Sequence, residues 1–112
     1  MTVGVDLDLL ENMAICLDRM EEYLASKVIY EKILQKSPSN IRCLNNLGNI
    51  FLIIGETNEA FYLFESILEK QPKNVDKRLK IADIYAEVGD WSKVEYHLLQ
   101  CYRQREHDVR IL

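Results

Sequence analysis

His97, Cys101 and His107 are the residues whose types and spacing come nearest to a chemical site. His97 and Cys101 are one helical turn apart, and imidazole and thiolate are common zinc ligands. Cys101, however, is equivalent in an internal repeat to Ile33 and Ile67, which favours a core role. His97 is likewise equivalent to Ile29 and Leu63. We therefore expect that His97 and Cys101 pack in a core and that the protein binds no metal.

The sequence lacks the patterns that usually accompany catalysis. It has no glycine-rich phosphate loop, no nucleophile elbow and no pair of convergent carboxylates. We therefore expect that the protein is not an enzyme and that it needs no cofactor.

The composition is typical of one folded domain. The chain has 112 residues, 48% of them hydrophobic, and a formal net charge of -4, so we predict a single domain over residues 1–112. Nucleic acid is disfavoured as a partner because its phosphates require clustered Lys and Arg. Cys16, Cys43 and Cys101 do not have the spacing of a secreted disulfide framework, which favours the cytoplasm. No apolar run approaches the length of a membrane span, so no membrane partner is expected.

The sequence repeats itself with a period of 34 residues. The equivalent positions are Leu10/Leu44/Arg78, Met13/Leu47/Ile81, Ala14/Gly48/Ala82, Leu17/Phe51/Tyr85, Ser26/Ala60/Val94, Tyr30/Phe64/Leu98 and Ile33/Ile67/Cys101. Cys16 is equivalent to Ile50 and Ile84, so we expect it to be buried as well. A repeat of this length is a supersecondary unit that buries its apolar face by stacking on its neighbours. We predict units at about 7–40, 41–74 and 75–108, with residues 109–112 as the start of a fourth.

Each unit is predicted to hold two helices, because apolar residues recur at intervals of three and four positions. The predicted helices are at about 7–20, 23–36, 41–54, 57–70, 75–88 and 91–105. Gly55 and Gly89 are typical of the turn between two helices. Glu21 stands at the equivalent position of the first unit, which predicts a strained or differently shaped turn there.

Other residues predict where the helices end. Pro38 and Pro72 follow the second helices of the first two units, and Asn40 and Asn74 are predicted caps for the helices that come next. Glu106 replaces the closing proline of the third unit, so the end of the last helix is unmarked.

The middle unit reads Leu44-x2-Leu47-Gly48-x2-Phe51, then Ala60-x3-Phe64, and closes with Pro72. This pattern resembles the tetratricopeptide repeat. The resemblance covers nearly the whole chain and implies an all-α fold, a right-handed α-solenoid of three helix-turn-helix units. It also implies that the first helices line a concave groove that binds a peptide or subunit of a partner protein, although fold alone does not determine function.

The expected groove residues are those beside the buried stripe of each first helix. The predicted partner site consists of Asn12, Ile15, Arg42, Asn45, Asn46, Asn49, Leu52, Ile53, Leu79, Lys80 and Asp83. Asn12, Asn46 and Lys80 are equivalent, and an amide can hydrogen-bond a peptide backbone of any sequence. The two asparagines are similar to the asparagine ladder of the O-linked N-acetylglucosamine transferase family. Asparagines that only solvate a helix face are an equal alternative.

The carboxylate clamp of tetratricopeptide chaperone adaptors fits less well. Asn46 and Lys80 suit it, but Glu11, Ile15 and Asp76 stand where the clamp has Lys, Asn and Lys. The predicted groove is mildly acidic, so we expect a neutral or basic protein partner with apolar anchors.

A second hypothesis is a self-assembling structural role. The predicted last helix carries Leu98, Cys101 and Tyr102 without a following helix to cover them. We therefore expect a segment of a larger array or a homo-oligomer formed through the C-terminal helix.

Overall fold

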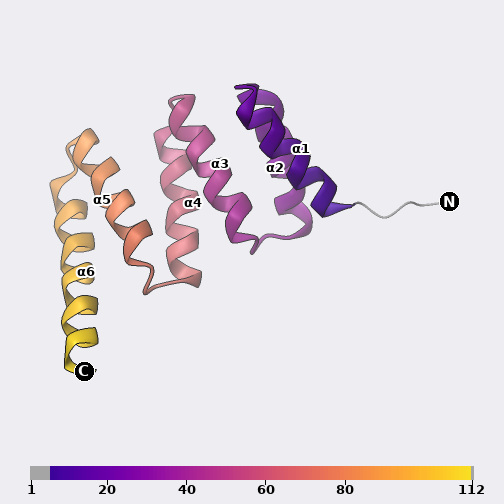
Figure 1. Cartoon of the computed structure of the whole chain (residues 1–112). Helices are drawn as coiled ribbons and strands as arrows, with labels where there is room; N and C mark the ends of the chain where they lie inside the picture. Colours follow the sequence, from indigo (N-terminus) through magenta and orange to yellow (C-terminus); the bar gives the residue numbers. More distant parts are fainter. Residues whose placement is uncertain (1–5, 112) are drawn as a thin grey trace. The chain divides into compact units, whose positions relative to one another are not determined.

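The computed structural model describes residues 6–111, and for residues 107–111 it describes the helical backbone alone. The helices in chain order are α1 (Leu7–Arg19), α2 (Tyr23–Lys36), α3 (Ile41–Ile53), α4 (Thr57–Lys70), α5 (Val75–Val88) and α6 (Trp91–Ile111) (Figure 1). The chain is thus all-α over its described residues, and its helices form the three predicted helix-turn-helix units.

The chain divides into two compact units, Met1–Leu63 and Phe64–Leu112, with the boundary inside α4. In the first unit, α2 packs against both α1 and α3. In the second unit, α5 packs against α6. Both α1/α2 and α5/α6 are antiparallel pairs joined by short turns (Figure 1).

Side-chain caps begin α1, α3, α5 and α6, the last through the Asp90 carboxylate, which accepts the backbone N–H of Lys93 at 3.3 Å. The side chain of Asn40 accepts the backbone N–H of Cys43 at 3.2 Å, and that of Asn74 accepts the N–H of Lys77 at 2.9 Å. Asp6 caps α1 in the same way. Each cap satisfies one of the backbone donors that a helix N-terminus leaves without an intrahelical partner. The two predicted asparagine caps are therefore confirmed.

The turns between the two helices of each pair (α1/α2, α3/α4 and α5/α6) share one backbone conformation. Gly55 and Gly89 have φ of 87° and 80°, and Glu21 at the equivalent position has φ of 61°. After each of these residues, a backbone N–H bonds to the carbonyl five residues earlier, as from Glu22 to Leu17 at 2.9 Å. The left-handed conformation disfavours a residue with a Cβ atom. The turn at Glu21 is therefore strained, as predicted, while its shape is that of the glycine turns.

The last helix is longer than predicted. The sequence pattern predicted a helix that ends near residue 105, but α6 continues to Ile111. Glu106, unlike a proline, does not disfavour helical backbone in the residue before it. Residues 109–111 continue this helix and Leu112 lies outside the described residues, so a fourth unit stays a prediction.

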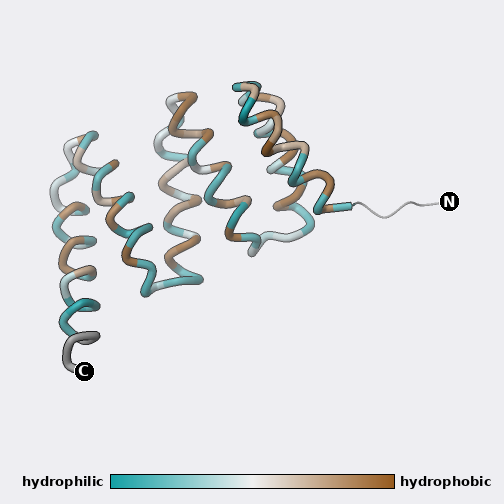
Figure 2. The backbone as a smooth tube through the Cα atoms, in the orientation of Figure 1, coloured by the Kyte–Doolittle hydropathy of each residue, from teal (hydrophilic) through white to brown (hydrophobic). Residues whose placement is uncertain are grey.

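Apolar residues alternate with hydrophilic ones along the helices and supply the core of each unit (Figure 2). Tyr30 and Ile33 are fully buried in the first unit, and Ile67 and Ile81 are fully buried in the second. Gly48 is buried in α3, as expected of the small residue shared by the first helices. None of the helices in the described part of the chain combines the length and the apolar character needed to cross a bilayer.

The prediction that Cys16 is buried is wrong, because its side chain is exposed. The equivalent Ile50 in α3 is only 2% exposed. The difference follows from position: α3 packs against the preceding α2, whereas no helix precedes α1 within residues 6–111. Equivalence in the repeat therefore indicates burial only where a neighbouring pair is present.

Candidate protein interface

The first helices of the unit Met1–Leu63 border a small hollow of about 190 Å³. Its lining residues are Asp8, Glu11, Asn12, Ile15 and Arg42. The structure thus brings together three residues of the predicted partner site, Asn12 and Ile15 from α1 and Arg42 from α3. An amide, an aliphatic side chain and a guanidinium lie side by side at this hollow.

Glu11 and Arg42 form a two-point ion pair within the hollow. The guanidinium Nε lies 3.2 Å from Glu11 Oε1, and Nη2 lies 3.3 Å from Oε2. The Glu11 side chain is 9% exposed, whereas that of Arg42 is 77% exposed. The guanidinium therefore neutralises the charge of a buried carboxylate, and much of the guanidinium stays accessible.

Two carboxylates of α1, Glu11 and Asp18, have polar partners within the unit. Glu11 is paired with Arg42. Asp18 accepts hydrogen bonds from the hydroxyls of Ser26 and Tyr30, the latter at 3.0 Å. These bonds tie α1 to α2.

Asn46 takes part in the same polar network. Burial raises the pKa of the Tyr30 hydroxyl and the Asp18 carboxylate raises it further, while a hydrogen bond with Asn46 opposes the shift. Asn46 is therefore an internal link between α3 and α2 as well as a predicted contact for a partner.

The row of asparagines is uneven in exposure. Asn12 is exposed, whereas Asn45, Asn46 and Asn49 are half-buried. Asn45 and Asn49 also make contacts within the chain. Asn12 is thus the most accessible amide among the four.

The apolar members of the predicted site in α3 differ as well. Ile53 is 58% exposed, near the C-terminal end of the helix, whereas Leu52 is half-buried. Cys43, on the same helix, is fully buried, and this burial, with the nearby Glu11 carboxylate adding to it, raises the pKa of the Cys43 thiol to about 11.

The unit Phe64–Leu112 holds the other three residues of the predicted site, Leu79, Lys80 and Asp83. They line a hollow of about 590 Å³ together with Ala82, Ala86, Val94 and Leu98. The Lys80 ammonium lies 5.1 Å from the centroid of the Phe64 ring. Burial lowers the pKa of Lys80.

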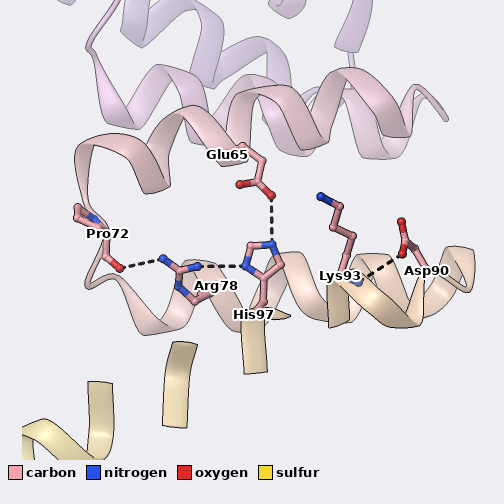
Figure 3. A network of polar contacts seen from close by, with 6 residues as sticks. All are labelled: Glu65, Pro72, Arg78, Asp90, Lys93 and His97. Carbon is pink, nitrogen blue, oxygen red and sulfur yellow. Dashed lines mark hydrogen bonds and ion pairs between the residues drawn. The ribbon is translucent and has the colours of Figure 1, made fainter. Parts of the chain in front are cut away.

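A polar network centred on the buried His97 was not predicted in this unit (Figure 3). His97 is 2% exposed, with its Nε2 3.2 Å from Glu65 Oε1 and its Nδ1 3.2 Å from Arg78 Nη1. Arg78 also donates to the carbonyl of Pro72 at 3.1 Å. The ring of His97 stacks on Tyr85, with centroids 5.8 Å apart.

The partners of His97 define its protonation. A guanidinium can only donate, so Nδ1 is the acceptor and Nε2 carries the proton that is donated to Glu65. Burial lowers the pKa of His97, the Glu65 carboxylate opposes this, and the Arg78 guanidinium lowers the pKa further. The ring is thus a neutral core residue that connects two charged side chains.

The sequence did contain a signal for this network. His97 was predicted to be a core residue because its equivalents are aliphatic, and it is buried. Arg78 belongs to the same third repeat as His97 and is equivalent to Leu44 of the second repeat. Polar residues therefore replace aliphatic ones at two equivalent positions of the third repeat. Two such replacements together indicate a paired polar contact.

No three His, Cys, Asp or Glu side chains gather as metal ligands in the described part of the chain. Cys101 is partly buried, and the side chain of His107 lies outside the described residues. Cys16, Cys43 and Cys101 are free thiols.

Comparisons with known proteins support the fold. No protein-family model matches the sequence, and no curated protein matches it either. The chain is similar in structure to MamA (TM-score 0.81, 12% identity, 94% of this chain and 61% of MamA) and to the CopN-Scc3 complex (TM-score 0.80, 12% identity, 90% of this chain and 59% of the matched chain).

A further similarity is to SycD, the type III secretion translocator chaperone of Yersinia enterocolitica, with a TM-score of 0.74 and 14% identity over 88% of this chain and 73% of SycD. The chain spans less than two thirds of the matched MamA and CopN-Scc3 chains. At these identities the similarity concerns the fold, which is a tetratricopeptide-like arrangement of helical repeats.

Proposed function

We propose that this chain is a non-catalytic, protein-binding scaffold module that holds a segment of a partner on its first helices. The observation that carries the proposal is the hollow formed by α1 and α3, where Asn12, Ile15 and Arg42 present an amide, an aliphatic group and a guanidinium. These groups offer hydrogen bonds and apolar contact to a peptide, and no redox or nucleophilic chemistry is needed. The three free cysteines suit an adaptor that acts in the reducing cytoplasm.

The chemistry of the hollow favours a neutral or basic segment. Asn12 can donate to and accept from a peptide backbone, and the exposed side of the Arg42 guanidinium adds donors. Asp8 supplies an exposed negative charge at the same hollow. Ile15 and Ile53 are the proposed contacts for apolar anchors of the partner.

The remaining residues of the predicted site stay part of the proposal as secondary contacts. They are Asn45, Asn46, Asn49 and Leu52 in the first unit and Leu79, Lys80 and Asp83 in the second. The structural similarity to a secretion chaperone and to a protein of the CopN-Scc3 complex is consistent with a protein partner.

A display library of random peptides can test the proposal, with the wild-type chain as bait. We expect enrichment of neutral or basic peptides that carry one or two apolar residues. Synthetic copies of these peptides should bind Asn12→Ala/Ile53→Ser at least about tenfold more weakly, since both substituted side chains are exposed. The melting temperature of the variant should stay close to that of the wild type.

Leu24→Ser is the matched control, because Leu24 is 70% exposed on α2, away from the hollow. It should bind the selected peptides like the wild type. Equal affinity of the wild type and Asn12→Ala/Ile53→Ser would contradict the proposed site. Enrichment of acidic peptides would contradict the proposed charge of the partner.

A further inference from the structure

The contact between the first two helical pairs has a distinct set of residues in α3. Cys43, Leu47 and Ile50 are 0%, 3% and 2% exposed. They recur at intervals of four and three residues, as a helical stripe does. Because α3 packs against α2, this stripe belongs to the face by which a helical pair joins the pair before it.

The equivalent stripe of α1 is open. Leu9 is 56% exposed, Met13 is 45% exposed, and Cys16 is exposed as well. Within residues 6–111, no helix precedes α1. The stripe stays apolar nonetheless, and Leu9, Met13, Cys16 and Leu17 line one apolar depression with Asn12.

The complementary face of α6 is open too. Tyr30 and Ile33 of α2, which α3 covers, are fully buried. Their equivalents in α6 are Leu98, which is 46% exposed, and Cys101, which is partly exposed. The hollow of about 590 Å³ between α5 and α6 is lined by Leu79, Ala82, Val94 and Leu98 among others, so it lies where the repeat would receive the next first helix.

The two open faces are the two halves of one kind of contact. In the observed contact, the stripe of α3 is the inserting face (the donor face) and the surface of α1 and α2 is the receiving face (the acceptor face). The stripe of α1 is equivalent to the donor face, and the hollow at α5 and α6 is equivalent to the acceptor face. We propose that two copies of this chain associate head to tail, with the Leu9/Met13/Cys16 stripe of one copy in the α5–α6 hollow of the other. The contact continues the observed α2–α3 packing with residues of the same apolar type.

This contact differs from the observed one in charge. The ion pair between Glu11 and Arg42 accompanies the packing of α3 on the first pair. The residues at the equivalent positions of the proposed contact are Leu79 on the receiving copy and Asp8 on the incoming copy. These two residues cannot form an ion pair, and the Lys80 and Asp83 side chains that also line the hollow carry opposite charges. The association should therefore depend on apolar contact and change little with salt.

The head-to-tail contact uses different surfaces on the two copies, so it is heterologous and gives either a closed ring or an open chain of copies. Each copy that joins leaves one open stripe and one open hollow. The association does not require the hollow between α1 and α3, but it shares Asn12 and the secondary contacts Leu79, Lys80 and Asp83 with the proposed partner site.

Sedimentation velocity over a concentration series can test the proposal. The wild-type chain should show a sedimentation coefficient that rises with concentration. Met13→Lys places a charge on the donor face, the stripe of α1, and Leu98→Lys places one on the acceptor face, the α5–α6 hollow. Each variant should self-associate at least about tenfold more weakly. Leu9→Lys is a second donor-face variant, and circular dichroism checks that all variants stay folded.

An equimolar mixture of Met13→Lys and Leu98→Lys is the decisive sample. Each variant keeps the face that the other has lost, so the mixture should form a dimer with one intact contact and go no further. Leu24→Lys is the control: Leu24 is 70% exposed and its equivalents Asn58 and Ser92 are exposed and polar, so this variant should associate like the wild type.

Several results would overturn the proposal. A wild-type chain that stays monomeric at every concentration would do so, as would a mixture that forms no dimer. A lower melting temperature of monomeric Leu98→Lys would show that a segment of the same chain covers the hollow. A strong loss of association in high salt would contradict its apolar character.

Discussion

The same two core positions are filled by different chemistry in the two units of the molecule. In the first unit they hold Leu44 and Leu63, which are 5% and 9% exposed. In the second unit they hold Arg78 and His97, whose side chains are hydrogen-bonded to each other at 3.2 Å. The repeat thus determines which positions face the core, whereas the residue type at these positions can change.

The polar version requires partners that the apolar version does not. The carboxylate of Glu65 accepts a hydrogen bond from His97 Nε2, and the carbonyl of Pro72 accepts one from Arg78 (Figure 3). A buried polar group without a partner would cost about 1–3 kcal/mol. At these two positions the second unit therefore depends on a complete network, whereas the first depends on apolar packing.

The largest effect is expected when the network is broken at its centre. His97→Ala removes a buried ring and leaves Arg78 and Glu65 without their shared partner, so we expect a loss of about 2–4 kcal/mol in the free energy of unfolding. Urea denaturation followed by circular dichroism measures it.

The double variant Arg78→Leu/His97→Leu gives the second unit the residues of the first. It should unfold within about 1 kcal/mol of the wild type, because replacing a whole buried polar pair is far less costly than removing one member. A double variant as unstable as His97→Ala would mean that the two units are not interchangeable at these positions.

The next effect compares the small residues of the first helices. Gly48 and Ala82 are both buried, but Ala82 also lines the hollow of about 590 Å³. Gly48→Leu should destabilise the chain by about 1–3 kcal/mol through overpacking, and Ala82→Leu by less, because the hollow can receive the side chain. Thermal melts of both variants give the order, and the reverse order would contradict our view of the hollow.

A smaller effect concerns the turns. Glu21→Gly should stabilise the chain by about 0.5–1 kcal/mol, because glycine adopts the left-handed conformation without strain. Gly55→Ala should destabilise it by a similar amount, about 1 kcal/mol, since an added Cβ meets no atom within 4 Å and only the conformation changes. Opposite signs in chemical denaturation are the expected outcome, and equal signs would show that the turns differ.

The smallest effect should come from pH alone. The pKa of His97 is lowered in the folded state by burial, while an unfolded histidine titrates near about 6.5. The stability that this residue contributes is therefore present above that pH and is lost as the pH falls toward the folded-state pKa. The free energy of unfolding of the wild type should decline more between about pH 7.5 and 5.5 than that of Arg78→Leu/His97→Leu, and equal declines would show that His97 binds its proton readily when folded.

Most of the helical architecture could be predicted from the sequence, because local signals determine it. The 34-residue period, the caps at Asn40 and Asn74 and the glycine turns act within a few residues of the helix ends. The length of α6 could not be predicted in the same way, since the absence of a proline at Glu106 removes a stop signal without giving another.

The candidate site was harder to predict, because it depends on pairing between helices. Asn12, Ile15 and Arg42 lie at one hollow, and their contact with a partner stays a prediction. The pairing of Arg42 with Glu11 and the bond of Asn46 to Tyr30 join residues on different helices, and no local pattern signals such contacts. Cys16 was predicted to be buried because its equivalents are Ile50 and Ile84, but its exposure depends on which helices lie beside α1.

The unequal burial of the Glu11–Arg42 pair has a consequence for the order in which these residues can change during evolution. Loss of Arg42 would leave a carboxylate that is 9% exposed without its counter-charge, whereas loss of Glu11 would leave a guanidinium that water already reaches. Lineages should therefore replace Glu11 before Arg42, and intermediates with Arg42 alone should be common among descendants. The order of substitution, rather than the pair itself, would record which side of this contact faces water.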